Sequence, residues 1–358
     1  MSDSEDNSRN PTVSRIRHYA DILNPLFWHD DFYRIDRLFE WACTVVRASG
    51  LKDTGWDSYT ESLALLNDLT QLQQIELPVD KFPLPDHTRA RLALISYSHV
   101  IEMSFPYEIL ANLLRLRVNL KYSMDPLSHL DRPIEKKING VKVVQKVIPA
   151  SPDKKIKEIE DMSAKAGLPG IGVALRNIYN ATIRNAVYHS DYAIHANSMR
   201  LLSGNFFSKK EGVYTPLISF DELAEITNEA FAFHSALFAL WKRARNSFTD
   251  FRDKFLPYDH HYKGILQFTF DGDTLTGFRT YWPNGTIGIC GRGMDGESYA
   301  QNIRFDPDGS INFMIGTLAS KPGSFSPCVE DGDQPLYAPV PGTEKRPYWP
   351  SLPQAYEL

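Results

Sequence analysis

The stretch of sequence that decides the fold reads LRNIYNATIRNAVYHSDY and spans residues 175–192. Its less polar residues recur at intervals of three and four, the spacing of one face of an α-helix. They are Leu175, Ile178, Tyr179, Thr182 and Ala186. We therefore expect one uninterrupted amphipathic helix, which the turn at 168–170 precedes and which carries polar side chains on its other face.

The same spacing extends outward over most of the chain before residue 257. It predicts helices at 12–23, 31–49, 57–74, 88–119 and 219–245. Gly50 should end the second helix, because glycine readily adopts a left-handed backbone. Pro106 should kink or split the fourth helix, because proline lacks an amide hydrogen. A new helix should start after Ser151 and end at Gly167, and residues 204–216 should form a loop.

Two regions show β patterns instead. Residues 133–148 surround Asn139-Gly140, the strongest short signal for a two-residue hairpin turn, and they contain Lys136, Lys137, Lys142 and Lys146. Residues 263–317 alternate between apolar and polar types, and turn dipeptides separate the runs. The turn dipeptides are Asp271-Gly272, Asn284-Gly285 and Asp308-Gly309. We expect a basic hairpin inserted among helices, a later antiparallel meander, and an extended proline-rich tail from Lys321.

The predicted fold class is therefore mainly α with a C-terminal β module, an α+β multidomain chain. A length of 358 residues exceeds what one hydrophobic core usually holds. We divide the chain into an N-terminal helical segment at 1–84, a central helical domain at 85–256 and a C-terminal antiparallel β domain at 257–358.

Composition limits the class of protein. Hydrophobic residues make up 42% and charged residues 23%, which is typical of a folded globular chain. The sequence holds no apolar run long enough to span a bilayer, and its first residues are acidic, unlike a secretion signal. We expect a soluble, cytoplasmic protein without membrane contacts. Cys43, Cys290 and Cys328 are too few and too dispersed for a disulfide framework, so we expect buried or incidental thiols.

Charge is unevenly distributed. Residues 113–184 carry 14 Lys/Arg against 7 Asp/Glu, although the whole chain has a net charge of -5. Such a basic stretch can attract a polyanion, because neutralising phosphates releases counterions. A solvated charged surface is the alternative.

The run from Ile183 to Ser190, IRNAVYHS, resembles the HEPN (higher eukaryotes and prokaryotes nucleotide-binding) ribonuclease family. The family pattern places an arginine and a polar residue a few positions ahead of a histidine, as Arg184, Asn185 and His189 stand here. The resemblance covers about residues 85–256. It implies a helical bundle and RNA cleavage by a homodimer without metal or cofactor, in which a ribose 2'-hydroxyl attacks the phosphorus and a 2',3'-cyclic phosphate results.

The residue types suit that chemistry. His189 is the candidate general acid or base, because imidazole exchanges a proton near neutral pH. Arg184 is the candidate phosphate clamp, since a planar cation offsets charge in the transition state. Asn185 would orient the histidine or the substrate. Positions five apart on a helix differ by about 140°, so we expect a composite site across a two-fold axis.

Seven further residues are candidates for contacting RNA. On a continuous helix, Arg176, Asn180 and Tyr188 share the face of Arg184, and Tyr188 and Tyr192 could stack on bases. Lys136, Lys137 and Lys142 of the hairpin could contact phosphates. Ordinary surface packing is the alternative for each of these residues.

Other interpretations stay open. His189 could be a core histidine, with Arg184 in a surface ion pair. Asp259-His260-His261 and His29-Asp30-Asp31 contain metal-ligating types, but neighbouring residues rarely converge on one ion without other partners, so we expect no metal. The resemblance also implies a toxin or anti-phage defence effector with an antitoxin or regulatory partner. The alternative function is a non-catalytic HEPN-like scaffold that binds nucleotides or proteins.

Overall fold

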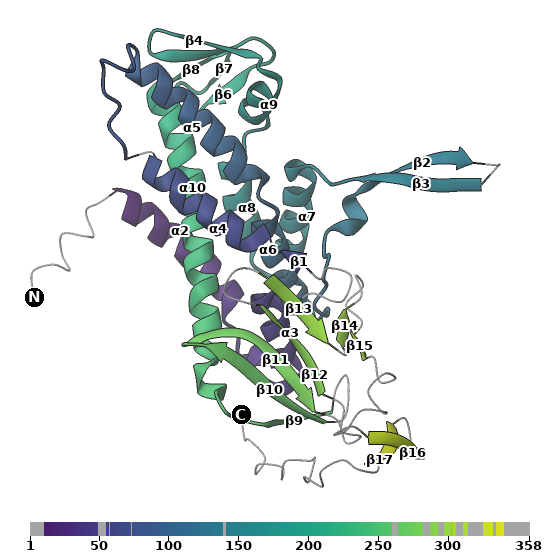
Figure 1. Ribbon diagram of the computed structural model, residues 1–358. Helices are drawn as coiled ribbons and strands as arrows, with labels where there is room; N and C mark the ends of the chain where they lie inside the picture. Colours follow the sequence, from purple (N-terminus) through teal and green to yellow (C-terminus); the bar gives the residue numbers. More distant parts are fainter. Residues whose placement is uncertain are drawn as a thin grey trace, which may run out of the picture. The chain divides into compact units, whose positions relative to one another are not determined.

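The chain packs into two compact units, each built from three stretches (Figure 1). Unit 1 comprises 1–25, 61–110 and 130–240, and unit 2 comprises 26–60, 111–129 and 241–358. The computed structural model describes residues 11–48, 55–56, 58–72, 74–138, 141–259, 264–281, 287–292, 297–301, 303–305, 311–313, 325–331 and 334–339. Each unit combines stretches from more than one of the three expected parts.

Helices supply most of unit 1, as the 3.6-residue periodicity predicts. They are α2 (Pro11–Phe27), α4 (Ser58–Leu72), α5 (Pro85–Glu102), α6 (Ser104–Arg117), α7 (Pro152–Lys165), α8 (Pro169–Ile178), α9 (Ala181–His189) and α10 (Phe220–Asn246). The division between the units falls within α2, α4, α6 and α10.

The core of unit 1 consists of apolar side chains from these helices. Leu94, Val100 and Ile101 of α5 are fully buried, as is Phe233 of α10. An aromatic contact joins α6 to α10, where the rings of Phe105 and Phe238 stack with their centroids 5.5 Å apart. Burial of these side chains is the main source of the unit's stability.

The predicted interruption near Pro106 is confirmed as a complete break. Met103 separates α5 from α6, and Pro106 lies in the first turn of α6. At that position the missing amide has no helical acceptor to lose. The prediction of a new helix after Ser151 is also confirmed, since α7 begins at Pro152 and Gly167, with φ +72°, follows its end.

The uninterrupted helix predicted around residues 175–192 is wrong. Helix α8 ends at Ile178 and α9 begins at Ala181, with extended backbone at Tyr179 and Asn180. The buried Tyr97 hydroxyl of α5 donates to the Ile178 carbonyl at 3.0 Å and accepts from the Asn180 N–H at 2.6 Å. This hydroxyl thus satisfies the two backbone groups that the break exposes, which sequence periodicity could not reveal.

Short strands follow α9 where a loop was expected. Strands β4 (Tyr192–His195), β5 (Ser198–Leu201) and β8 (Leu217–Ser219) form one antiparallel sheet, and β6 (Phe206–Ser208) pairs with β7 (Val213–Thr215). The predicted loop at 204–216 is therefore wrong for the residues of β6 and β7. Three-residue strands are too short to show the alternation that identifies a strand.

The basic hairpin is confirmed. Strand β2 (Arg132–Ile138) pairs antiparallel with β3 (Val141–Ile148). The turn at Asn139-Gly140 lies outside the described residues. Figure 1 shows the two strands extending away from the helices of unit 1.

An antiparallel sheet dominates unit 2 and confirms the predicted meander and the α+β class. Its strand order is β1-β13-β12-β11-β10-β9. The strands are β1 (Gly55–Trp56), β9 (Leu256–Tyr258), β10 (Gly264–Asp271), β11 (Thr274–Tyr281), β12 (Ile287–Arg292) and β13 (Glu297–Gln301), and two further pairs join β14 (Ile303–Phe305) to β15 (Ile311–Phe313) and β16 (Phe325–Asp331) to β17 (Gln334–Pro339). Gly272 turns between β10 and β11 with φ +52°. The other two predicted turn dipeptides lie outside the described residues.

Helix α3 (Ile35–Val46) packs against this sheet within unit 2, after the 3-10 turn η2 (Asp30–Tyr33). Phe39 of α3 meets the ring of Phe278 at 4.9 Å, and Trp41 meets Phe248 of η5 (Ser247–Phe251) at 4.6 Å. The predicted helix end at Gly50 is wrong, because α3 ends at Val46 and Arg47 adopts the left-handed backbone with φ 53°. Gly50 itself lies outside the described residues.

The structure bears on two predictions made from composition, those on membrane spans and on cysteines. None of the helices in the described part of the chain is sufficiently long and apolar to traverse a membrane. Cys43 and Cys290 are buried free thiols, as expected, whereas the side chain of Cys328 lies outside the described residues.

Candidate active site around Arg184 and His189

Helix α9 carries the three candidate catalytic residues. It spans nine residues, with Arg184 near its start and His189 at its end. Asn180 caps its N-terminus, since the Asn180 side-chain oxygen accepts the Ile183 N–H at 3.0 Å. Ile183 and Ala186 are buried, and this apolar side holds α9 against α5.

Three side chains contact the Arg184 guanidinium, namely those of Glu102, Asn185 and Tyr188. Its Nε donates to Oε1 of Glu102 at 2.6 Å, and its Nη2 also contacts that oxygen. Its Nη1 donates to the side-chain oxygen of Asn185 at 2.9 Å. The guanidinium lies over the ring of Tyr188, 4.6 Å from its centroid. Glu102 is the last residue of α5, so tertiary packing brings it to α9.

These contacts orient the Arg184 guanidinium but do not occupy all of its N–H donors. The Arg184 and Glu102 side chains are 25% and 30% exposed, so solvent or a ligand reaches the pair. A guanidinium has five N–H donors, more than Glu102 and Asn185 occupy. Burial raises the pKa of Tyr188, and Glu102 adds to that rise while Arg184 opposes it. Arg184 can therefore hold a phosphate oxygen while Glu102 and Tyr188 keep it in place.

Asn185 lies on the exposed side of α9 and contacts Arg184 rather than His189. The predicted role of Asn185 in orienting the histidine or the substrate stays a prediction. Its observed contact shows that it positions the arginine.

His189 is exposed at the last position of α9. Within the described part of the chain, its imidazole makes no hydrogen bond or ion pair. The alternative of a core histidine is therefore wrong, whereas the ion pair expected for Arg184 in that alternative is confirmed with Glu102. A free imidazole at the surface can exchange a proton with a bound substrate.

Arg176 is held by carboxylates of α7. It donates to Asp153 at 2.6 Å and to both oxygens of Glu160 at 3.0 and 2.7 Å, which joins α8 to α7. The hydrogen bond that Arg176 donates to Glu160 is the main reason that the pKa of Arg176 is raised. The continuous helix on which Arg176, Asn180 and Arg184 were expected to share a face is interrupted, because α8 ends at Ile178 and the Asn180 side chain caps α9.

The remaining substrate-contact candidates occupy separate places. Tyr188 is 50% exposed beside Arg184, and Tyr192 is half-buried on β4. Lys136, Lys137 and Lys142 are exposed on the β2–β3 hairpin, which lies away from α9 in Figure 1. The structure thus brings together Arg184, Asn185 and Tyr188 but not the hairpin lysines.

Glu102 and Tyr97 contact the candidate residues Arg184 and Asn180, which the sequence did not reveal. Glu102 precedes Arg184 by 82 residues, and Tyr97 precedes Asn180 by 83. No local periodicity relates residues at such separations. Their roles depend on how α5 packs on α8 and α9.

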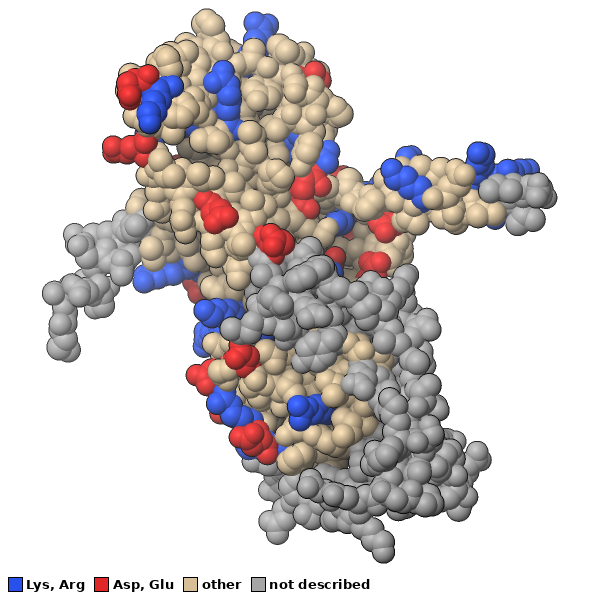
Figure 2. Space-filling view, viewed as in Figure 1, with Lys and Arg blue, Asp and Glu red and all other residues tan. Residues whose placement is uncertain are grey.

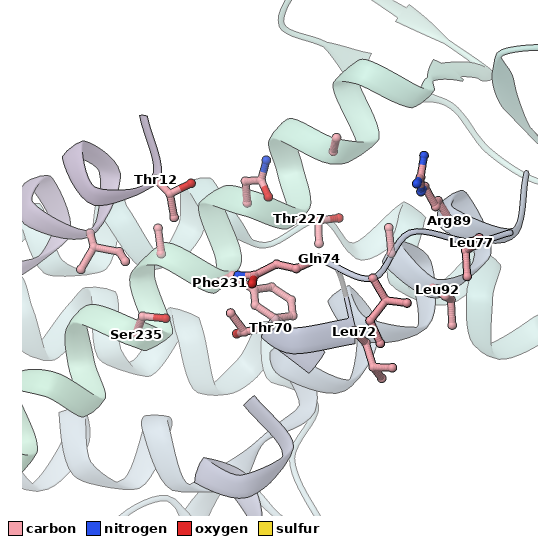
Figure 3. A pocket seen from close by; sticks show the side chains of 16 residues that line it. Thr12, Thr70, Leu72, Gln74, Leu77, Arg89, Leu92, Thr227, Phe231 and Ser235 are labelled. Atoms are coloured by element: carbon pink, nitrogen blue, oxygen red, sulfur yellow. The ribbon is translucent and has the colours of Figure 1, made fainter. Parts of the chain in front are cut away.

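Two hollows of unit 1 lie elsewhere. One cavity has a volume of about 380 Å³. Its lining includes Thr70 of α4, Leu92 of α5 and Phe231 of α10 (Figure 3). A second hollow, of about 520 Å³, is lined by Asn180, Phe206 and Glu225, among others. Neither lining includes Arg184 or His189.

Comparison of the chain with protein-family models, curated proteins and solved structures gave no match. The assignment of a function therefore depends on the residues of α9 and on their surroundings.

Proposed function

We propose that this chain is a metal-independent endoribonuclease of HEPN type that acts as a homodimer. The observation that carries the proposal is the pairing, on one short helix, of an oriented arginine with an exposed histidine. Arg184 keeps N–H donors beyond those that Glu102 and Asn185 occupy. His189 presents an imidazole to solvent at the other end of α9.

These groups match the needs of RNA transesterification. A base removes the proton of the ribose 2'-hydroxyl, and its oxygen forms a bond to the adjacent phosphorus. The bond from phosphorus to the 5'-oxygen breaks, and an acid gives that oxygen a proton. His189 serves in proton transfer, and Arg184 offsets the extra negative charge on the phosphoryl oxygens. The products are a 2',3'-cyclic phosphate and a 5'-hydroxyl.

The spacing of the two residues supports a site shared between two chains. Residues 184 and 189 project about 140° apart on α9. Two copies related by a two-fold axis can place Arg184 of one chain against His189 of the other. A toxin or anti-phage effector with an antitoxin or regulatory partner is the biological role that the HEPN resemblance implies.

The first experiment compares the wild-type protein with His189→Ala and His195→Ala on RNA in excess EDTA. His195 is an exposed histidine at the end of β4 and serves as the matched control. We expect cleavage by the wild type and His195→Ala, cyclic-phosphate ends, and no cleavage by a folded His189→Ala variant. Equal cleavage by all three proteins would exclude the proposed site.

A mixing experiment tests the shared site. Arg184→Gln and His189→Ala should each lose most of the cleavage activity, whereas a refolded mixture contains heterodimers with one complete Arg184–His189 pair if the pair forms between chains. Recovered activity in the mixture supports the composite site. An inactive mixture that contains heterodimers places the two residues of each site in the same chain.

One contact favours a second function. Glu102 already neutralises Arg184, which suits a module that binds a nucleotide or a partner without cutting RNA. In that case the wild type should leave RNA intact at every protein concentration while still binding nucleotides. Binding without cleavage, weakened by Arg184→Gln, would support this alternative.

A further inference from the structure

The β2–β3 hairpin is an exposed element of unit 1. Every side chain described between Arg132 and Val147 is exposed. Four of them are large aliphatic groups with exposed fractions between 40% and 53%, namely Ile134, Val143, Val144 and Val147. A two-stranded hairpin is only marginally stable in water by itself, so exposed aliphatic groups on such an element indicate a surface that receives a ligand.

Strand register divides the hairpin into two unlike faces. Directly opposed residues of an antiparallel pair share a face. One face, called here the basic face, carries Arg132, Ile134, Lys136, Val143 and Lys146, because Ile134 opposes Lys146 and Lys136 opposes Val143. This face holds three cations and no carboxylate. The opposite face carries Glu135, whose carboxylate pairs with Lys142 at 2.8 Å.

A β-bulge produces the basic face. The register shifts between Ile134 and Glu135, so that Val144 opposes Glu135 while Lys146 opposes Ile134 and Gln145 is the extra residue. Strict alternation would place Lys146 on the same side as Val144. The bulge instead turns Lys146 toward Lys136. Each of these rungs then pairs one lysine with one aliphatic side chain, and the cations alternate between the strands.

We infer that the basic face of this hairpin binds the sugar-phosphate backbone of double-helical RNA. Figure 2 shows the blue side chains of the hairpin projecting into solvent, where they can reach phosphates. Three uncompensated cations complement a polyanion. A two-stranded ribbon is narrow enough for the grooves of a duplex, and the wide minor groove of RNA exposes ribose groups that aliphatic side chains can contact.

The composition of the hairpin favours a duplex over a single strand. Proteins that hold single strands stack aromatic side chains on the bases. Residues 132–148 contain no aromatic side chain and no histidine. The ribbon therefore offers charge and aliphatic contact to a regular backbone but nothing on which an unpaired base could stack. This inference rests on the proposed function, because it names the class of RNA that the unit carrying α9 would hold.

The test measures binding separately from cleavage. All proteins carry His189→Ala, and fluorescence anisotropy follows a labelled 20-base-pair RNA duplex and the matching single strand over a salt series. Lys136→Gln/Lys146→Gln removes two cations from the basic face. Lys137→Gln/Lys142→Gln is the matched control, since it removes one lysine from each strand on the opposite face, where Glu135 pairs with Lys142. The inference thus assigns phosphate contact to Lys136 and Lys146 and not to Lys137 and Lys142, which the sequence alone had also made candidates.

We expect the basic-face variant to bind the duplex at least 10-fold more weakly and the control to change little. The magnitude of the slope of log affinity against log salt should fall by about 1.8 for the two lost cations. Equal weakening by both variants, or by neither, overturns the inference. Single-strand binding that is as tight and as sensitive to the basic-face variant overturns the duplex preference.

The two proposals fail independently. If His189→Ala leaves cleavage intact in the parent protein, the proposed active site fails while the anisotropy data still decide the hairpin. If the wild-type protein cleaves RNA and His189→Ala abolishes cleavage, but Lys136→Gln/Lys146→Gln does not weaken duplex binding, the hairpin inference alone fails. A light-scattering mass that changes with the hairpin variants would instead make the ribbon a contact between copies of this chain.

Discussion

Helices α8 and α9 carry arginines in related but unequal surroundings. Arg176 of α8 lies 6.0 Å from the ring centroid of Tyr179, and Arg184 of α9 lies 4.6 Å from that of Tyr188. Arg176 meets two carboxylates and joins α8 to α7. Arg184 meets one carboxylate, that of Glu102. Two carboxylates make the immediate surroundings of Arg176 net negative, whereas a single carboxylate balances Arg184, so a phosphate meets less repulsion at Arg184.

Two histidines differ in the same way. His189 ends α9 at the surface, whereas His234 lies fully buried in α10. The Nδ1 of His234 donates to the Ala230 carbonyl at 2.7 Å, and its Nε2 has no hydrogen-bond partner in the described structure. Burial lowers the pKa of His234 to about 4, so it stays neutral in the folded protein at physiological pH. Position in the fold decides which histidine can transfer protons.

The largest expected effect separates the two arginines. Arg184→Gln should lower the rate of RNA cleavage by about 10²–10³-fold, the usual cost of removing one donor that stabilises a transition state. Arg176→Gln should leave the chemical step nearly unchanged, because Asp153 and Glu160 already engage this side chain. Single-turnover kinetics on proteins with verified folding checks this difference. Equal loss in both variants would remove the distinction between α8 and α9.

The buried histidine should make the protein sensitive to acid. Below its ordinary pKa of 6.5, His234 takes up a proton in the unfolded chain but stays neutral in the native protein until about pH 4. Its contribution to stability is therefore present above pH 6.5 and is lost as the pH falls to 4, by about 3 kcal/mol.

Urea unfolding over this pH range measures the loss. His234→Gln should show a shallower fall in unfolding free energy with acid, whatever its stability at neutral pH. His189→Ala is the exposed control and should follow the wild type. An unchanged pH dependence in His234→Gln would show that other groups cause the acid sensitivity.

The break between α8 and α9 should depend on one hydroxyl. Tyr97→Phe leaves the Ile178 carbonyl and the Asn180 N–H without their buried partner, so the unfolding free energy should fall by about 2 kcal/mol. Tyr107→Phe removes a single bond to the Ile101 carbonyl and should cost about 1 kcal/mol. Denaturant titration compares them, and a larger cost at Tyr107 would contradict this account of the break.

The cap of α9 should make a smaller contribution. Asn180→Ala removes the acceptor of the Ile183 N–H and should lower the unfolding free energy by about 1 kcal/mol. Asn180→Asp keeps that acceptor and should retain most of the stability. Asn177→Ala, on the exposed side of α8, is the control and should not destabilise the protein. Thermal unfolding of the three variants provides the comparison.

The smallest expected effect concerns the tyrosine under Arg184. Tyr188→Leu removes the aromatic face and should cost about 0.5 kcal/mol, since Tyr188 is half exposed. Tyr188→Phe keeps that face and should match the wild type in unfolding free energy. A Tyr188→Phe variant as unstable as Tyr188→Leu would assign the effect to the hydroxyl instead.

Much of the fold follows from local sequence. Helix α10, the β2–β3 hairpin and the β10–β13 meander each contain their own periodicity and, for the most part, their own turn residues. These elements could be predicted because residues close in the chain determine them. The sequence also showed which residue types of α9 suit phosphate chemistry.

The surroundings of those residues depended on the tertiary structure. Tyr97 divides the expected helix, and Glu102 orients Arg184, although both lie more than 80 residues away from their partners. The bulge that sets the basic face of the hairpin arises from strand register rather than from alternation along β3. The sequence by itself determined most of the helices, the basic hairpin, the meander and the chemical groups that they carry, but not the break between α8 and α9 or the short strands β4–β8. Packing between distant segments decided which groups are satisfied, buried or left free for a ligand, because desolvation and hydrogen bonding depend on neighbours that local periodicity does not identify.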